Sequence, residues 1–458
     1  MQLYDSKAHE LVDLKPINSG HVSIYVCGPT VQSEPHIGHL RSALVYDLLS
    51  RWLAHKGLKV TLIRNITDID DKVLEKHTDE LSWWELAYKN ELEFQRQFDA
   101  LGIQRPSNEP RATGHIPEIL QMISKLVDAG FAYRANNGDV YFDSASWSDY
   151  GELTNQKPDD MEGEGAGEFK KSATDFTLWK ASKDTEPESA SWESEFGRGR
   201  PGWHIECSAM AEKYLGKNFD IHGGGLDLRF PHHENELAQS RASGSEFANL
   251  WMHNGLVTVE GSKMSKSLGN SVFGAELLKS HSPMVLRYYL LSAHYRSVLD
   301  YQSGSLDEAE SALERIEGFV ERATRKLGDS QYTIENLIPE AFDVAMEDDL
   351  NLPAAIAILH EKVREGNQAL DEQRLRDAAG SLGEVLAMLE ILGIEFETES
   401  TGAEMLALGS LIEEQIRLRS EARENKDFDL ADQIRDKLSE IGVTLEDDAD
   451  GTTWSIDA

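Results

Sequence analysis

The sequence predicts an α/β protein: a parallel-sheet domain split by an insertion, followed by an α-helical bundle and a small C-terminal α+β domain. Two observations predict the sheet: the apolar, β-prone runs at 24–26 and 60–66, and the helical pattern that lies between them. The order strand, helix, strand implies parallel strands joined by a right-handed crossover. A third observation, apolar residues at helical spacing after Ser282, predicts the bundle.

The first strand, Ile24 to Val26, is short and is stopped by Gly28–Pro29. A helix is expected from about 37 to 57, because four apolar side chains recur along one face: Leu40, Leu44, Leu48 and Trp52. The run at 60–66 is the next strand. Its carboxyl end carries a polar cluster at 67–72, where Asp68 or Asp70 would cap the following helix.

The start of the first helix is expected to bind an anion. His36, Gly38 and His39 lie there, and free backbone N–H groups at a helix start attract negative charge. Gly38 leaves room for a flat ligand against the backbone. Cys27, at the end of the preceding strand, points to the same edge of the sheet, which is where ligands bind in open α/β folds.

The region from 104 to 200 is expected to interrupt the sheet domain. Helices are predicted at 83–102 and 116–129, with prolines between them, and strands at 139–143 and 175–180. Residues 157–171, rich in Gly, Glu and Asp, are expected to form a mobile loop.

The second half of the sheet domain is expected to hold a helix at 205–215, strands at 219–222 and 250–257, and a helix from about 231. Three glycines, Gly223 to Gly225, are expected to turn the chain tightly. A polar, basic loop covers 261–270. Beyond it we expect only helices, including 307–325, 352–370 and a pair within 405–442, and then a hairpin at 443–454.

Composition limits the class of protein. The chain has 458 residues, a net charge of −36 and only two cysteines, so a disulfide framework is excluded. The absence of a long apolar run and of a secretory pattern predicts a cytoplasmic protein without a membrane span. The acidity argues against nucleic-acid binding, unless a local basic face exists within the screening distance.

Four side chains form a candidate zinc site. His232 and Glu236 are four residues apart at a helix start and share a face. With Cys27 and Cys207 they would supply two thiolates, an imidazole and a carboxylate, all of which are zinc ligands. The alternatives are two core thiols or a single disulfide for the cysteines, and other ligands from the same region: His222, His233 and Glu234.

The run Lys263-Met-Ser-Lys-Ser267 lies between glycines in a predicted loop. Its two flexible ammonium groups, Lys263 and Lys266, suit a polyphosphate. The alternative interpretation is a solvated basic turn.

Together these motifs resemble a known family. His36-Ile-Gly-His39 and Lys263 to Ser267 match the two motifs of class I aminoacyl-tRNA synthetases. Five further stretches resemble the cysteinyl-tRNA synthetase family within that class: Cys27-Gly-Pro-Thr30, Thr67 to Asp71, Gly199 to Cys207, His222 to Gly225, and Phe230 to Glu236.

The resemblance implies a Rossmann-like catalytic domain and a domain order. The catalytic domain would have its first half at 1–103 and its second half at 201–258, with a connective insertion at 104–200. The Lys-Met-Ser-Lys-Ser loop and a stem-contact region would occupy 259–305. The helical bundle would span 306–397, and an anticodon-binding domain 403–458.

The resemblance also implies an activity: a cysteine–tRNA ligase that uses ATP to form cysteinyl-adenylate and then charges tRNA(Cys). One Zn²⁺ per chain would sit on the four-ligand set of Cys27, Cys207, His232 and Glu236, and select the substrate thiolate. Mg²⁺ would accompany ATP. The catalytic residues would be His36, His39, Lys263 and Lys266. Cysteine and ATP would be bound by Gly28, Thr30, His36, Gly38, His39, Thr67, Trp203, His222, Gly224, Gly225, Asp227 and Lys266.

The resemblance implies that the protein is a monomer and that its partner is tRNA. Basic residues near the C-terminus are candidates for phosphate contacts, with helix-surface ion pairing as the alternative: Arg417, Arg419, Arg423, Lys426 and Arg435. Two other functions remain open. One is a ligase that transfers cysteine to an amino sugar, as in mycothiol synthesis. The other is a non-catalytic tRNA-binding module.

Overall fold

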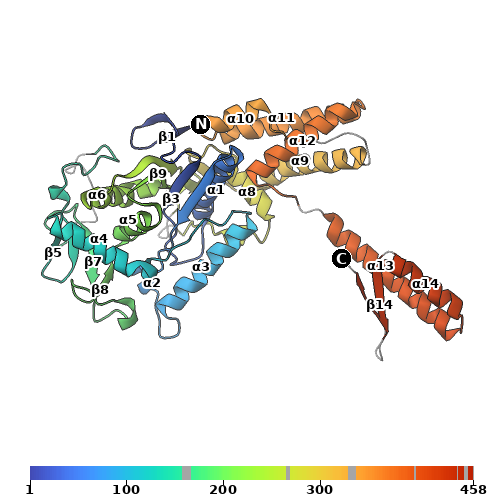
Figure 1. Ribbon diagram of the computed structural model, residues 1–458, viewed down its shortest axis with the longest axis horizontal. Helices are drawn as coiled ribbons and strands as arrows, with labels where there is room; N and C mark the ends of the chain where they lie inside the picture. Colours follow the sequence, from blue (N-terminus) through green and yellow to red (C-terminus); the bar gives the residue numbers. More distant parts are fainter. Residues whose placement is uncertain are drawn as a thin grey trace. The chain divides into compact units, whose positions relative to one another are not determined.

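A four-stranded parallel sheet organises the N-terminal half of the chain (Figure 1). Its strands are β3 (His21–Val26), β4 (Lys59–Arg64), β9 (Asn218–Gly225) and β10 (Phe247–Asn254), in the order β10-β9-β3-β4. All neighbouring pairs are parallel. Helix α1 (Ile37–His55) is the crossover between β3 and β4. The predicted α/β class is therefore confirmed.

The structure, a computed structural model, describes residues 1–156, 167–264, 269–328, 337–396, 399–440, 442–447 and 452–456. The chain divides into two units, Met1–Glu395 and Phe396–Ala458. Most of the loop predicted at 157–171 lies outside the described residues, and so does Lys266.

Helix α1 is buried along the predicted face, where Leu40, Leu44, Leu48 and Trp52 are fully covered. Helix α2 (Asp71–Leu74) follows β4, and Asp70 caps it by accepting a hydrogen bond from the Lys72 amide. A hairpin of β1 (Gln2–Asp5) and β2 (Glu10–Asp13) precedes the sheet. This hairpin was not predicted from the sequence, because each of its strands has only four residues.

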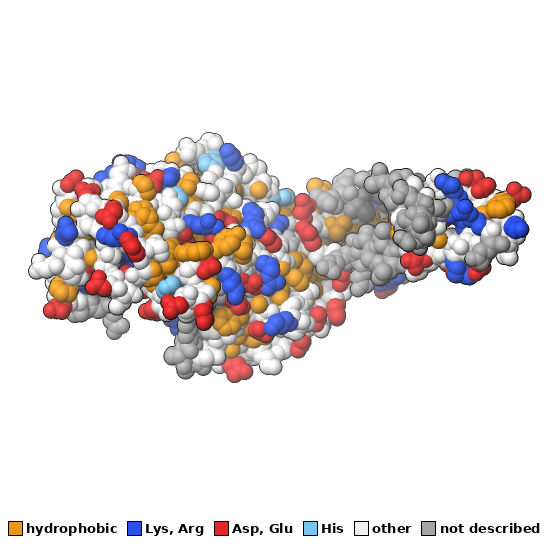
Figure 2. Space-filling model, turned by 90° about the horizontal axis from the view of Figure 1, so that it is seen from below, with side chains coloured by type: hydrophobic (Ala, Val, Ile, Leu, Met, Phe, Trp, Pro, Cys, Tyr) orange, Lys and Arg blue, Asp and Glu red, His pale blue; other side chains and the backbone are white. Residues whose placement is uncertain are grey.

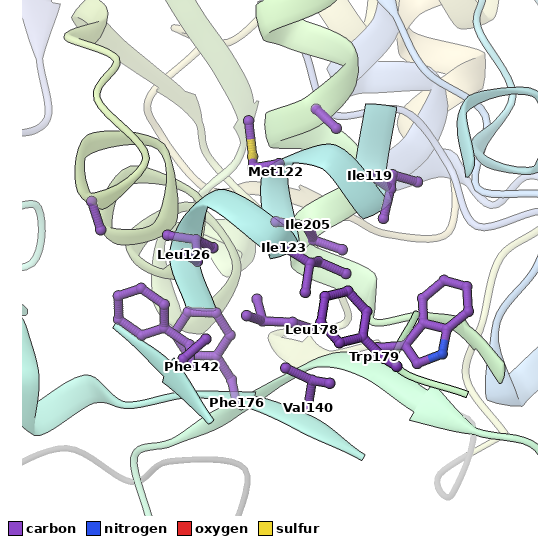
Figure 3. Close-up of a cluster of buried hydrophobic side chains, with 14 of the residues drawn as sticks. Ile119, Met122, Ile123, Leu126, Val140, Phe142, Phe176, Leu178, Trp179 and Ile205 are labelled. Carbon is purple, nitrogen blue, oxygen red and sulfur yellow. The ribbon is translucent and has the colours of Figure 1, made fainter. Parts of the chain in front are cut away.

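The insertion shares its core with the second half of the sheet domain. After α3 (Trp83–Ala100) come α4 (Ile116–Asp128) and an antiparallel sheet of β5 (Ala132–Arg134), β6 (Val140–Phe142), β7 (Phe176–Ala181) and β8 (Gly199–Pro201). Figure 3 shows Ile119, Ile123 and Leu126 of α4 above Phe142, Phe176 and Leu178 of the sheet. Ile205 of the following helix joins the same cluster, so this packing fixes the insertion on that helix.

Helices α5 (Trp203–Leu215) and α6 (Glu234–Ala242) flank β9 in the sequence. The expected tight turn at Gly223 to Gly225 is wrong: these glycines continue β9 and pair with β10. Their small size serves close packing instead. A Cβ atom at Gly223 would lie 2.3 Å from the Tyr46 ring, and one at Gly224 would lie 2.8 Å from the His233 ring.

The expectation of helices alone after Ser282 is also wrong. Strand β13 (Leu299–Tyr301) pairs in parallel with β11 (Val257–Val259), which pairs with β12 (Ser262–Lys263). The expected strand at 250–257 is divided between β10 and β11. Strand β13 is three residues long and pairs only with distant segments, so periodicity gives little sign of it.

The bundle consists of α8 (Pro283–Leu291), α9 (Ser305–Leu327), α10 (Glu340–Glu347), α11 (Leu352–Asp371) and α12 (Leu375–Leu392), with the short α7 (Gly274–Leu277) before it. A buried ion pair ties it to the sheet domain. The Arg287 guanidinium of α8 lies 2.6 Å from the Asp47 carboxylate of α1 and donates to the carbonyls of Leu101 and Leu392. Neither charged side chain is exposed.

The second unit holds α13 (Glu399–Glu424), α14 (Phe428–Glu440) and a hairpin of β14 (Val443–Asp447) and β15 (Thr452–Ile456), as predicted. Its core is Ile412, Ile434, Leu438, Val443 and Leu445. Two of the arginines considered for phosphate contacts are paired or buried in this unit. Arg417 pairs with Glu414 and Glu421, and Arg419 is only 5% exposed.

Candidate active site

The carboxyl ends of the parallel strands open into a cavity of about 370 Å³. We call it the first cavity. Cys27 to Thr30 line it after β3, Gly225 and Asp227 after β9, and Asn254 to Val257 after β10. Phe94 and Phe98 of α3 close one side. Residues from distant parts of the sequence meet here because parallel strands end at one edge of the sheet.

The four predicted zinc ligands converge beside this cavity. Cys27, Cys207, His232 and Glu236 are buried, and one potential ligand atom from each lies within 4.8 Å of all the others. Both cysteines are free thiols. The Cys27 thiol donates to Glu236 Oε1 at 3.2 Å, and His232 Nε2 lies 3.0 Å from the same oxygen. His232 lies in the helical turn Arg229–His233 that leads into α6, and Glu236 lies in the first turn of α6, so the imidazole and the carboxylate come together as the spacing predicted.

A second set of side chains meets the same geometric criterion: Cys27, His222, His233 and Glu236. Hydrogen bonds favour the first set. His204 Nδ1 lies 2.8 Å from His232 Nδ1, which leaves His232 Nε2 directed at the cluster. His222 Nε2 lies 2.9 Å from Glu236 Oε2, the position of an outer group that orients a ligating carboxylate. Glu234 is committed elsewhere, since it accepts from the Gly151 and Thr154 amides.

Burial controls the protonation of these groups. Burial, with Cys207 and Glu236 close by, raises the pKa of the Cys27 thiol, and burial also raises the pKa of Cys207. Burial and the neighbouring His204 lower the pKa of His232 well below its ordinary value. A neutral imidazole is ready to bind a metal, whereas the thiols would lose their protons to a cation placed among them. The two sulfurs, the nitrogen and the oxygen therefore fit zinc.

The start of α1 is capped by its own histidines. His36 Nδ1 accepts from the Gly38 amide, and His39 Nδ1 accepts from the His36 amide, both at 3.2 Å. The two rings stack with centroids 3.6 Å apart. The expected free backbone N–H groups are therefore occupied, and the Ile37 amide also bonds to the Val272 carbonyl. This expectation is corrected: an anion here would meet imidazole edges.

Protonation at this helix start follows from the same contacts. Burial, and then the neighbouring His36, lowers the pKa of His39 well below its ordinary value. A neutral ring that accepts at Nδ1 carries its proton on Nε2. His39 is thus a neutral donor at the edge of the first cavity.

Ten of the predicted site residues line the first cavity: Cys27, Gly28, Thr30, His36, Gly38, His39, Trp203, Gly225, Asp227 and Lys263. Trp203 also stacks on the His232 ring, with centroids 4.0 Å apart. Thr67, His222 and Gly224 lie behind the wall. Thr67 donates to Glu206 Oε2 at 3.2 Å. A Cβ atom at Gly28 would lie 1.7 Å from the Asn65 carbonyl oxygen, so strand packing requires that glycine.

The sequence analysis missed several lining residues. Phe94 and Phe98 are four apart on a predicted helix, but spacing did not reveal which surface this face meets. Arg64 ends β4, lines the cavity, and places its guanidinium over the Phe98 ring at 4.3 Å. Asn254 ends β10 and Gly255 to Val257 follow it, and strand order alone would have placed them at this edge.

Comparison with known proteins agrees with this geometry. The family model for the tRNA synthetases class I (C) catalytic domain matches residues 13–311. The DALR domain matches 341–397, and the cysteinyl-tRNA ligase anticodon binding domain matches 407–454. The chain belongs to the cysteinyl-tRNA synthetase family. The third match lies within the anticodon-binding domain expected at 403–458.

Relatives resemble this chain over its whole length. It is 54% identical to a cysteine–tRNA ligase of Clavibacter michiganensis, over all of this chain and 99% of the relative. A cysteine–tRNA ligase of Leifsonia xyli is 55% identical over the full length of both. Among solved structures, a Mycobacterium tuberculosis methionyl-tRNA synthetase with methionyl-adenylate has a TM-score of 0.60. It is 15% identical, with 81% of this chain and 89% of the other covered, which shows a shared fold.

Among the described residues, no helix is long and apolar enough to cross a membrane.

Proposed function

We propose that this cysteinyl-tRNA synthetase joins L-cysteine to tRNA(Cys) in two steps. The cysteine carboxylate attacks the α-phosphorus of ATP, and pyrophosphate leaves. A hydroxyl of the terminal tRNA ribose then attacks the activated carbonyl carbon; an ester forms and AMP leaves. One observation carries the proposal. The buried cluster of Cys27, Cys207, His232 and Glu236 adjoins a cavity that is also lined by His36, His39 and Lys263.

One Zn²⁺ per chain would be held by Cys27, Cys207, His232 and Glu236. When bound, it would supply a soft acceptor for the substrate sulfur, which the hydroxyl of serine cannot match. Two observations support this zinc site. The four side chains offer ligand atoms that zinc prefers, and hydrogen bonds orient two of them, from His204 to His232 and from His222 to Glu236. Trp203 and Thr67, with Gly28 and Thr30, would surround the small amino acid.

The nucleotide would occupy the other end of the first cavity. His36 and His39 would donate hydrogen bonds to the phosphates and stabilise the charge that develops on the α-phosphate. Lys263, together with Lys266, would neutralise the departing pyrophosphate, and Mg²⁺ would enter with ATP. Gly38, Gly224 and Gly225 would let the nucleoside approach the backbone, and Asp227 would accept from the ribose hydroxyls.

The tRNA would contact both units of a monomer in the cytoplasm. The second unit, which matches the anticodon-binding domain, would reach the anticodon. Arg435 and Lys426 are exposed there. The net charge of −36 does not prevent this, because charges act locally at physiological salt. On the face of the larger unit drawn in Figure 2, Lys and Arg side chains are interspersed with hydrophobic and acidic ones.

The test is cysteine-dependent exchange of pyrophosphate into ATP, followed by a choice of acceptor. The purified protein should catalyse exchange with cysteine and not with serine, and should label tRNA rather than glucosaminyl-inositol. Lys263→Ala should slow exchange by roughly 10²-fold. Lys89→Ala, which removes an exposed lysine of α3, is the matched control. Label on the amino sugar, or exchange without cysteine, would contradict the proposal.

A further inference from the structure

A second cavity of about 220 Å³ adjoins the first. Its lining residues are Thr30, Asp70, Asp71, Lys72, Lys180 and Trp203. Thr30, Lys72 and Trp203 line both cavities. None of the histidines at the start of α1 lines the second cavity, and neither does Lys263. It therefore opens from the amino-acid end of the active site and lies away from the groups proposed to hold the pyrophosphate.

Two of the four charged side chains that line this cavity, Asp71 and Lys180, neutralise each other. The Asp71 carboxylate pairs with Lys180 at 2.6 Å and also with Arg200, which join α2 to β7 and β8 of the insertion. Burial alone would raise the pKa of Asp71, but Lys180 and Arg200 outweigh it and lower that pKa. Asp71 and Lys180 thus form a fixed wall that leaves little net charge for a ligand.

The other polar groups are available. Lys72 is exposed and has no ion-pair partner among the residues that the structure describes. Asp70 uses Oδ1 to cap α2 at 2.9 Å from the Lys72 amide, which leaves Oδ2 open. The aromatic ring of Trp203 also lines this cavity. A cation, a carboxylate oxygen and an aromatic ring match the phosphate, ribose hydroxyls and base of one nucleotide.

We propose that the second cavity receives the 3′-terminal nucleotide of the acceptor RNA, with Asp70 accepting from its ribose hydroxyls and Lys72 facing its phosphate. This assignment rests on the proposed function. In the transfer step the ribose oxygen must reach the activated carbonyl carbon. The oxygen–carbon ester bond forms, the bond from that carbon to AMP breaks, and the hydroxyl proton leaves with AMP. The terminal ribose must therefore lie beside Thr30 and Trp203, where the two cavities meet.

The test uses Asp70→Asn in the full-length protein, because asparagine keeps the helix cap and removes the charged acceptor. Pyrophosphate exchange should keep its KM for cysteine within about twofold of the wild type. Charging of tRNA should fall about tenfold or more, as for the loss of a hydrogen bond to a charged group. Lys89→Ala is again the control for an exposed charge.

A binding measurement separates a contact from a general structural effect. The wild type should bind intact tRNA more tightly than tRNA that lacks its terminal nucleotide. Asp70→Asn and Lys72→Ala should each reduce this ratio toward one. A higher KM for cysteine in exchange would assign Asp70 to the substrate ammonium and overturn the proposal. Unchanged charging with an unchanged binding ratio would also overturn it. If the wild type fails to exchange pyrophosphate at all, the proposed function itself has failed.

Discussion

Replacing the sulfur of Cys207 in the candidate metal site tests which of the two ligand sets would hold the proposed zinc ion. Cys207 belongs only to the set with His232, and His233 only to the set with His222. Cys207→Ser is nearly isosteric and leaves a hydroxyl, which is a far weaker zinc ligand than a thiolate. His233→Asn is the matched control. It removes a buried imidazole whose ring bonds to His253 at 2.8 Å and orients none of the ligands favoured here.

The expected loss of zinc affinity follows from the number of ligands. Structural zinc contributes about 10–16 kcal/mol to a four-ligand site at neutral pH, or about 3–4 kcal/mol per ligand. At about 1.4 kcal/mol per factor of ten, losing one ligand weakens binding by about 10²- to 10³-fold. The serine hydroxyl would retain part of the binding energy of the lost ligand. Water cannot easily replace the sulfur, because Cys207 is only 1% exposed. We therefore expect zinc to bind about 10²-fold more weakly to Cys207→Ser and less than about tenfold more weakly to His233→Asn.

The assay is zinc content after dialysis against a chelator of known affinity, with thermal unfolding to establish that each variant is folded. The wild type should retain about one zinc per chain, Cys207→Ser should release it at a much lower chelator concentration, and His233→Asn should follow the wild type. The reverse order, with zinc lost from His233→Asn and kept by Cys207→Ser, would refute the assignment. A wild type that is active without metal would refute the selection of cysteine by zinc.

Three further predictions concern stability and the two units. Arg287→Met should lower the free energy of unfolding by about 3–5 kcal/mol in urea titrations, because it leaves the buried Asp47 carboxylate with Arg51 as its one remaining guanidinium partner and removes the donor of two carbonyls, those of Leu101 and Leu392; a loss below about 1 kcal/mol would contradict this. Burial lowers the pKa of His253 to about 3, so below about pH 6.5 the unfolded chain binds a proton that the folded chain excludes. Between pH 6.5 and 5.5 the wild type should therefore lose about 1 kcal/mol of stability more than His253→Asn, and equal losses would exclude this effect. A chain ending at residue 395 should keep pyrophosphate exchange and charge tRNA poorly, and equal loss of both activities would indicate a folding role for the second unit.

Local patterns allowed much of the fold to be predicted. The helix of α1, its buried face and the break between α13 and α14 follow from side-chain spacing within one element. The elements that were missed or misplaced depend on distant partners. Strand β13 exists because it pairs with β11, and Gly223 and Gly224 stay in β9 because Tyr46 and His233 pack against them.

The sequence by itself determined which chemical groups this protein has: a pair of motifs for ATP, two thiols, and an imidazole and carboxylate four residues apart on one helix. These depend on residue type and on spacing within single elements, which local geometry fixes. Only the tertiary structure decided that Cys27 and Cys207 meet at one cluster, because that requires β3 and α5 to pack side by side. It also decided that a second cavity opens beside Trp203, between residues of the sheet domain and Lys180 of the insertion. Contacts between segments far apart in the chain are set by packing, and no local pattern contains them.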